Sequence, residues 1–391
     1  MKCLRNLLSV SLAVITMGSA HAAVFQVTSI NDSGPGSLRE AIELANANGE
    51  ADTIEFMVTG TIVLQSNLPT LTESVVIQGS GTNELIIDGS QDYRPFRLGG
   101  AVGASYVIRD LTLRNGFSND AGGAIVILSN ASLILTRCIV EDSVALNQGG
   151  GIAAYGPVQI TDTIIRANQS SFGGGALLQG TGHSLKRSSI LLNSAEIGGG
   201  IYVDSAASAE IENVTVAGNS ASNDSQNALG GGLAVISGSA AIRHSTFAFN
   251  LADSGAGVAF IGAGAAAEFA NNILDDNRTW ADGTANCSGV VPNNFANLST
   301  DGTCQIYGAN DLEFVDPLLD SLDFYGGLTL SLLPRPGSPA VNSAENSLCA
   351  SHDQRNRPRP ESPGGTCDRG AVEVHPDEDY PQDIIFSNRF D

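Results

Sequence analysis

The chain has 391 residues, enough for two or three ordinary domains or for one extended array of repeats. Its formal net charge of −22 argues against a nucleic-acid partner, because binding nucleic acid requires a basic face. After the first 22 residues, no apolar run approaches the ~20 residues that a membrane-spanning helix needs.

The first 22 residues resemble a secretory signal peptide. Lys2 and Arg5 precede an apolar stretch, Leu7 to Met17, and Ala20-His21-Ala22 provides a small-x-small cleavage site. We therefore expect an exported protein, extracellular or on the outer cell surface, whose mature chain begins at Ala23.

Residues 23–60 contain the one strong helix signal in the chain, and we expect them to form an N-terminal cap. Ser37 and Glu40 have the spacing of a capping box, and Asn48-Gly49 ends the pattern. One helix face is apolar: Leu38, Ala41, Ile42 and Ala45. Short strands are expected nearby, at Thr53–Phe56, Thr61–Leu64, Val75–Gln78 and Leu85–Ile87.

Residues 61–280 repeat. Glycine-rich segments such as "GGGIAAYG" at Gly149 recur, and when they are aligned an asparagine recurs as well. The aligned asparagines are Asn168, Asn193, Asn219, Asn250 and Asn277, at steps of 25, 26, 31 and 27 residues. Each unit contains two or three short alternating segments and no amphipathic helix. Units of this length with three short strands predict an all-β fold, a parallel β-helix.

The repeat assigns structural roles to its recurring residues. Glycine suits sharp turns and close approach of neighbouring coils, and stacked asparagines suit a hydrogen-bonded ladder on another turn. Alternation predicts which side chains face the core after the glycines and on the second strand: Ile152, Ala176, Ile201, Leu233, Val258; Ala154, Leu178, Val203, Val235, Phe260; Ile160, Leu185, Ile211, Ile242, Phe269. Cys138 shares an inward position with Thr163 and Ser188, so we expect a buried free thiol.

Charged residues align on the outward side in two rows, Arg137–Asp162–Arg187 and Lys186–Glu212–Arg243. We interpret both rows as ion pairs across strands, in which each carboxylate lies between two cations. His183 and His244 are expected at the surface. No spacing of His and Cys residues fits a metal site, and no cofactor is predicted.

The outward positions of the strand that follows the glycines are unusually apolar. The rows comprise Ile125, Leu177 and Tyr202, and Ile127, Tyr155, Ile236 and Ile261. A contiguous apolar strip on a protein surface marks a contact. The C-terminal segment folding back, a protein partner or a glycan are the candidate occupants. The candidate binding strip is Tyr155, Leu177, Tyr202, Ile236 and Ile261.

We expect residues 281–373 to contain the last coils and a C-terminal region that departs from the repeat, followed by an acidic linker and short tail, residues 374–391. Two local disulfides are expected in an exported protein, Cys287–Cys304 and Cys349–Cys367.

Several motifs resemble those of exported bacterial proteins. Val27 to Phe56 is similar to the N-terminal "CSLREA" region, although Gly36 replaces its cysteine. The Gly-Gly-Ala-Ile segment at Gly122 and "FAFN" at Phe247 resemble the repeats of polymorphic outer-membrane proteins. "PGSPAVNSA" from Pro336 and "CDRGAVE" from Cys367 resemble the choice-of-anchor Q domain. These resemblances imply a right-handed, pectate-lyase-like solenoid that is surface-associated, and they supply no catalytic residues.

Two functions fit this reading. We expect a non-catalytic, monomeric surface or secreted protein that binds a glycan or a surface partner. The alternative is a polysaccharide lyase or glycoside hydrolase acting on an acidic polysaccharide. Hydrolases need paired carboxylates, and lyases need a free basic residue beside a cation or metal. Lys186, Arg187, Arg243 and His244 are expected to lie together on the outward side, but Asp162 and Glu212 are expected to pair with them.

Overall fold

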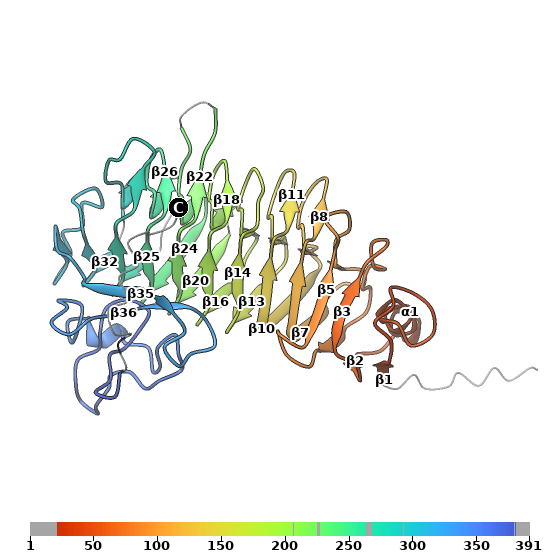
Figure 1. Ribbon diagram of the computed structural model, residues 1–391. Helices are drawn as coiled ribbons and strands as arrows, with labels where there is room; N and C mark the ends of the chain where they lie inside the picture. The colour runs from red at the N-terminus through yellow and green to blue at the C-terminus, as the bar shows by residue number, and fades with distance from the viewer. Residues whose placement is uncertain are drawn as a thin grey trace, which may run out of the picture.

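The computed structural model describes residues 22–205, 207–224, 227–262, 268–291, 293–378 and 380. The chain winds into successive coils, and nearly every strand pairs in parallel with its equivalent in the next coil (Figure 1). The predicted all-β parallel β-helix is therefore confirmed. The predicted signal peptide before Ala22 and the end of the predicted tail, 381–391, lie outside the described residues. Within the described part, no helix combines the length and apolar character needed to cross a membrane.

The strands form long rows that run along the solenoid. The first row contains β1 (Val24–Val27), β2 (Asp52–Phe56), β4 (Val75–Gln78), β7 (Ala104–Arg114), β10 (Ala131–Glu141), β13 (Val158–Thr161), β16 (His183–Lys186), β20 (Ser208–Glu212), β24 (Ser239–Arg243), β28 (Glu268–Ala270) and β32 (Asn294–Phe295). The second row shares the long strands β7 and β10 and adds β3 (Gly60–Val63), β5 (Leu85–Asp88), β14 (Ile164–Arg166), β17 (Ser189–Leu191), β21 (Thr215–Ala217), β25 (Thr246–Ala248), β29 (Ile273–Asp275), β33 (Leu298–Ser299) and β34 (Leu312–Glu313).

The third row follows the glycines, and a fourth row of very short strands lies just before them, between the second row and the glycines. The third row contains β6 (Phe96–Leu98), β9 (Ile125–Ile127), β12 (Ile152–Ala154), β15 (Ala176–Gln179), β19 (Ile201–Asp204), β23 (Leu233–Val235), β27 (Val258–Phe260) and β31 (Cys287–Ser288). The short strands are β8 (Phe117–Ser118), β11 (Val144–Ala145), β18 (Ser194–Ala195), β22 (Ser220–Ala221), β26 (Leu251–Ala252) and β30 (Arg278–Thr279).

Each strand pairs in register with the equivalent strand of the next coil, so equivalent side chains stack on one another. Ile160 pairs with Leu185, and Leu185 with Ile211, and all three are fully buried. The other residues predicted to face inward are buried as well, in one continuous hydrophobic core. Cys138 is buried and unpaired, and burial raises the pKa of its thiol to about 12, which keeps the thiol protonated and unreactive.

The five aligned asparagines form one buried ladder. The Asn193 amide donates to the Asn219 side-chain oxygen over 2.9 Å and to the Ile165 carbonyl over 3.0 Å. The same arrangement links the other members and extends to Asn286. Because each amide bonds to the next coil, the ladder ties neighbouring coils together inside the core.

Glycines occupy the turn where two coils approach most closely. Gly149 has a φ of +61°, which favours glycine, and a side chain there would lie 2.3 Å from the Ile152 carbonyl oxygen. At Gly150 a side chain would lie 2.4 Å from the backbone oxygens of Gln169 and Gly174. The recurring glycines are therefore required by the stacking itself.

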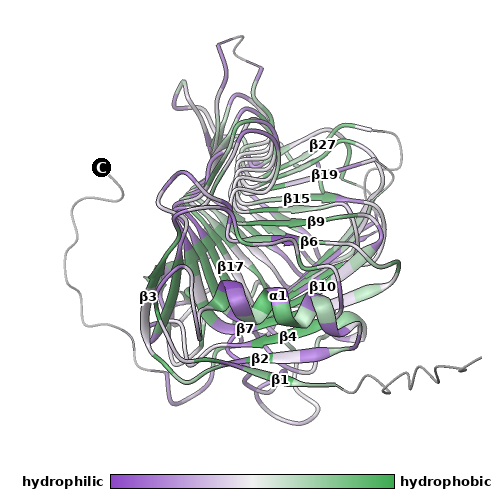
Figure 2. Cartoon of the chain, turned by 90° about the vertical axis from the view of Figure 1, so that its right-hand side faces the viewer, coloured by the Kyte–Doolittle hydropathy of each residue, from purple (hydrophilic) through white to green (hydrophobic). Residues whose placement is uncertain are grey.

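Helix α1 (Leu38–Asn48) covers the N-terminal end of the solenoid, as Figure 2 shows in a view along the coils. Its predicted apolar face is buried in the core, and Gly49 ends the helix in the left-handed conformation. The Ser37 hydroxyl accepts a hydrogen bond from the Glu40 amide, and the Glu40 carboxylate accepts one from the amide of Gly36. The four N-terminal strands begin and end within one residue of their predicted bounds.

The other end of the solenoid is closed by a disulfide-bonded loop. Cys287 bonds to Cys304, and Cys304 and Ile306 are buried in the main core. The second predicted pair, Cys349–Cys367, also forms. It lies in a C-terminal region with an antiparallel hairpin, β35 (Leu319–Asp323) and β36 (Ser331–Pro334), and a short 3₁₀ helix, η1 (Asn346–Leu348). Figure 1 shows this region alongside the later coils.

Candidate functional site

Most of the apolar strip predicted as a binding surface is covered by neighbouring side chains. Leu177 is fully buried and Tyr202 is only 8% exposed. Both pack with Phe172 and Ile197 from the glycine-side turns, and the Phe172 and Tyr202 rings lie 5.5 Å apart. Tyr155, Leu177, Tyr202 and Ile236 therefore belong to a small second core, whereas Ile261 remains 46% exposed outside it.

Two residues of the predicted rows face the opposite way. Ile125 pairs with Ile152, Ile127 pairs with Ala154, and all four side chains are buried in the main core. The outward residue of this strand is Val126, which joins the second core. The prediction was wrong because it placed Ile125 and Ile127 one position out of register, and a one-residue shift reverses the face.

The C-terminal region covers the second row of strands, and not the apolar strip predicted on the third row. Leu322 and Leu330 pack against outward side chains of the second row, namely Ile164, Leu191 and Ala217. Gln354 extends the contact, because its amide bonds to the Ser189 and Thr329 hydroxyls and the Thr215 hydroxyl donates to its carbonyl oxygen over 2.6 Å. The second row is therefore occupied from within the chain.

Arginines of the C-terminal region attach it to the later coils. Arg369 donates to the carbonyl oxygens of Asn297, Asn310 and Ser343 over 2.8, 2.6 and 2.9 Å. Burial lowers the pKa of Arg369 to about 10, which leaves it charged at neutral pH. These contacts are structural, since each arginine donor is used by backbone carbonyls of the chain itself.

Both histidines expected at the surface are buried. His183 lies against the Gln179 carbonyl oxygen at 3.0 Å, and burial lowers its pKa. His244 lies beneath the C-terminal region, where the Arg359 guanidinium is 2.7 Å from its Nδ1 atom. Burial, and then the neighbouring Arg359 charge, hold the pKa of His244 well below its usual value. His183 was misplaced because it lies two residues before the inward-facing Leu185 on β16 and shares its face. His244 was misplaced because the residues that cover it, Leu348 and Arg359, lie more than 100 positions away in sequence.

Ion pairs line the outer face of the first row, with partners that differ in part from the prediction. Asp162 pairs with Arg187 at 2.8 Å, but Arg137 pairs with Asp110 instead of Asp162. Glu212 pairs with Lys186 at 3.6 Å. Arg243 pairs with Glu268 at 2.7 Å and with Glu210 at 3.8 Å. The partners differ because Asp110 stands opposite Arg137 in the preceding coil, and Glu268 lies in the next coil two residues before Ala270, the pairing partner of Arg243.

This pairing limits the chemistry of the face. The carboxylate of Glu268 has a lowered pKa, because the hydrogen bond from Arg243 favours its ionised form, so it is a poor general acid. Hydrogen bonds to the carboxylates likewise raise the pKa values of Arg187 and Arg243, which makes them poor bases. Over the described residues, no cluster of three or more His, Cys, Asp or Glu side chains is arranged to hold a metal ion.

An open groove lies along the fourth row, on the turn with the short strands. It has a volume of about 240 Å³, and we call it the turn groove: Val144, Ala145, Leu146, Gln169, Ser170, Ser171, Ser194, Ala195, Glu196 and Ser222. The Ser171 hydroxyl donates to the Glu196 carboxylate over 3.0 Å. The side chains of Gln169, Ser194 and Ser222 make no hydrogen bond to any residue that the structure describes, so their polar atoms are available to a ligand.

Strand pairing continues the groove along the solenoid. In the fourth row, one residue of each coil pairs with its equivalent in the next coil. The residues two positions after these paired residues form one line across six coils. We call this line the turn row: Leu146, Ser171, Glu196, Ser222, Asp253 and Trp280. Its strands β11, β18, β22 and β26 lie along one edge of the solenoid in Figure 1. Sequence alignment of the asparagines could have found this row, because each member lies three residues after an Asn or, at Leu146, after Ser143.

Trp280 ends the turn row with a half-exposed indole. Its Nε1 atom donates to the Ala221 carbonyl over 2.8 Å, although strand β26 separates β30 from β22. The side chain must therefore lie across β26, along the surface of the turn, and it stays 50% exposed. A tryptophan that is held by its N–H group and stays half exposed offers apolar ring surface to a ligand.

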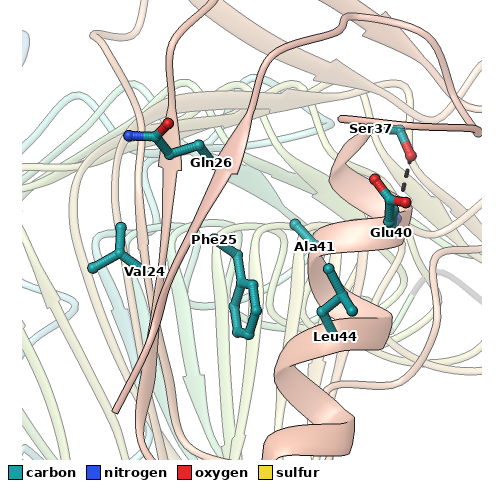
Figure 3. Close-up of a pocket in the computed structure, with 7 residues that line it drawn as sticks. All are labelled: Val24, Phe25, Gln26, Ser37, Glu40, Ala41 and Leu44. Atoms are coloured by element: carbon teal, nitrogen blue, oxygen red, sulfur yellow. Dashed lines mark hydrogen bonds between the residues drawn. The ribbon is translucent and has the colours of Figure 1, made fainter. Parts of the chain in front are cut away.

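A second cavity, of about 220 Å³, lies between β1 and α1 (Figure 3). Val24, Phe25, Ala41 and Leu44 supply its apolar walls. Of its three polar side chains, Ser37 and Glu40 already bond to backbone amides at the start of the helix, and Gln26 is the third. The cavity thus belongs to the joint between the cap and the first coil.

The chain was compared with known families, curated proteins and solved structures. A family described as "Right handed beta helix region" matches residues 101–315. The fold resembles that in "Crystal structure of pectate lyase Pel9A", with a TM-score of 0.51, 15% sequence identity, and coverage of 91% of this chain and 97% of the other. The comparison with curated proteins gave no match. Because the matched residues make up more than half of the 391-residue chain, the protein belongs to the right-handed β-helix family.

Proposed function

We propose that this protein is an exported, non-catalytic β-helix protein that binds a glycan along the turn row. The observation that carries the proposal is the combination of the turn groove with Trp280. The groove offers free hydroxyl and amide groups, and the half-exposed indole offers apolar ring surface. Sugars present both kinds of surface, because their rings have hydroxyl-rich edges and C–H faces. A site with a few polar groups beside an aromatic wall suits such a ligand.

Export is supported by the disulfides and by the N-terminal sequence. The chain forms two disulfides, Cys287–Cys304 and Cys349–Cys367, and disulfides persist in oxidising compartments. The N-terminal Lys2, Arg5 and the apolar segment after them have the pattern of a signal peptide. A glycan is a common ligand outside the cell, so export and glycan binding are mutually consistent.

Cleavage of an acidic polysaccharide is the competing function, suggested by the fold of the pectate lyase. Similarity at 15% identity supports the fold alone. A lyase needs an unpaired base, and three outward cations of the first row, Lys186, Arg187 and Arg243, are within ion-pair distance of carboxylates. Arg109 on β7, by contrast, has no ion pair among the residues that the structure describes. The paired face is the observation that favours binding over cleavage.

The test combines binding with turnover. The protein would be immobilised and exposed to a panel of neutral and acidic polysaccharides, with each mixture examined for new reducing ends and for ultraviolet-absorbing unsaturated products. Trp280→Ala should weaken binding by about thirtyfold, the effect of losing an interface hot spot of about 2 kcal/mol. Tyr307→Ala is the matched control, since Tyr307 is an exposed aromatic residue outside the turn row.

The outcomes separate the two functions. Retention of a glycan by the unaltered protein and by Tyr307→Ala, but not by Trp280→Ala, with no product formed, supports glycan binding. Release of unsaturated or reducing products by the unaltered protein contradicts the non-catalytic proposal. Retention of no glycan contradicts the binding proposal and directs attention to a protein partner.

A further inference from the structure

The charges along the turn row indicate whether a charged or an uncharged glycan would bind there. We propose that the ligand is an uncharged polysaccharide, without uronate or sulfate groups, that lies lengthwise along the turn row. This inference depends on the proposed glycan-binding function and deepens it. It runs against the acidic substrate that the pectate-lyase-like fold suggests.

Carboxylates are spaced along the row where a bound chain would lie. Glu196 lines the turn groove and is exposed, and Asp253 lies two coils further on, next to Trp280. The Asp253 carboxylate accepts a hydrogen bond from the Ala228 amide, and the Glu196 carboxylate accepts one from Ser171. Each carboxylate is therefore held in place by a hydrogen bond, and each would repel an anionic sugar above it.

Cations close to the row are already paired. Arg278 lies two residues before Trp280, and its Nε atom is 2.6 Å from the Asp276 carboxylate. The turn groove itself is lined by no lysine or arginine among the residues that the structure describes. The whole chain adds a field of the same sign, because its formal net charge is −22. An acidic polymer would thus meet repulsion both locally and at long range.

The same carboxylates suit a neutral sugar. A carboxylate accepts hydrogen bonds only, and sugar hydroxyls are donors. Members of the turn row are separated by the strand spacing of about 4.8 Å, which is comparable with one sugar unit of an extended polysaccharide. A chain lying lengthwise would therefore place successive rings over Ser171, Glu196 and Ser222 and could stack on Trp280 at the end.

The experiment measures the affinity of the full chain for dextran, xyloglucan and polygalacturonate, each at 50 and 500 mM NaCl. At least one neutral polymer should bind with a Kd that changes by less than about twofold between the salts, because screening acts only on charges. Polygalacturonate should bind at least about fivefold more weakly at 50 mM NaCl, the Coulomb repulsion expected near one exposed carboxylate.

Glu196→Gln isolates the charge. It should raise the affinity for polygalacturonate about threefold and lower the affinity for the neutral polymer about threefold, because an uncharged amide accepts weaker hydrogen bonds from sugar hydroxyls than a carboxylate does. Glu84→Gln, at an exposed glutamate on an early coil, should alter neither. Stronger binding of polygalacturonate than of either neutral polymer, weakened by salt and by Trp280→Ala, would overturn this inference while leaving glycan binding intact. If no polymer of either class binds, the proposed function fails and the inference fails with it.

Discussion

Asn219 makes five hydrogen bonds through its side chain within the ladder. Its amide donates to Ile190 and Asn250 and, over 3.3 Å, to the Ala217 carbonyl, and its oxygen accepts from the backbone and side chain of Asn193. Asn219→Ala would leave buried donors and acceptors unpaired, so the free energy of unfolding should fall by about 3 kcal/mol. Urea denaturation measures this value. Asn83→Ala, at an exposed asparagine, should stay within about 0.5 kcal/mol of the unaltered protein, and an equal loss at both positions would contradict the ladder's role.

His244 couples stability to pH. It is fully buried and neutral, with Arg359, Asn271 and the Leu348 carbonyl in contact with its ring and Arg243 nearby. Because its pKa is depressed on folding, its contribution is complete above about pH 6.5 and is lost as the pH falls further, by up to about 1.4 kcal/mol per pH unit.

Glu373 acts in the opposite direction across the same interface. Burial raises its pKa to about 7, so its contribution is complete at low pH and is lost as the pH rises from about 4.5 to 7. The two contributions therefore oppose each other between pH 6.5 and 5.5. His244→Asn removes only the histidine's loss, so on lowering the pH from 6.5 to 5.5 the free energy of unfolding of the variant should change by about 1 kcal/mol more favourably than that of the unaltered protein, measured by urea denaturation at each pH. The same replacement at the exposed His352 is the control. An unchanged pH slope in His244→Asn would show that the histidine is not held neutral.

At the scale of elements, α1 depends on its first turn. The Ser37 hydroxyl accepts from the Glu40 amide, and Ser37 itself is buried. Ser37→Ala should lower the free energy of unfolding by about 1 kcal/mol, the usual cost of losing a helix cap. Ser33→Ala, at an exposed position in the preceding loop, should have no measurable effect. Hydrogen exchange at Ala41 and Ile42 would locate the loss, and protection unchanged in Ser37→Ala would contradict the cap assignment.

The sequence predicted the elements that repeat and missed the contacts that do not. The Asn193 ladder and the Ile160 core row could be read from alignment because equivalent residues must stack in a solenoid. The burial of His244 could not, since Arg359 and Leu348 come from a segment without the repeat. Ile125 was misplaced because alternation fixes a face only when its starting residue is correct. The turn row escaped notice because its members, such as Ser171 and Trp280, share a position and no chemistry.

At the scale of the whole molecule, the C-terminal region braces several coils at once. Thr329 contacts the Arg187 carbonyl, His352 contacts Asn213, Ala371 contacts Thr246, and Arg369 contacts Asn297. Solenoid coils otherwise touch only their neighbours and can open separately. The braced coils should therefore open together, and the early coils independently of them.

Hydrogen exchange tests this bracing. Gln354→Ala removes bonds to Ser189, Thr215 and Thr329, so amide protection in β17 and β21 should fall by about tenfold or more, while β4 and β5 keep theirs. Gln169→Ala is the matched control, because its exposed side chain makes no such contact. An equal loss of protection along the whole solenoid would show that the coils open as one unit without the brace.

The asparagine ladder also keeps neighbouring coils stacked where the loops beside them differ in length. Eleven residues, 222–232, connect β22 to β23, whereas five residues, 196–200, connect β18 to β19. Even so, Asn219 and Asn250 bond at 3.0 Å, the same distance as Asn168 and Asn193. Loop length on this edge carries little thermodynamic penalty, because closure entropy grows slowly. In evolution, the loops beside the turn row can therefore change in length and sequence while the fold of the coils that carry them stays the same.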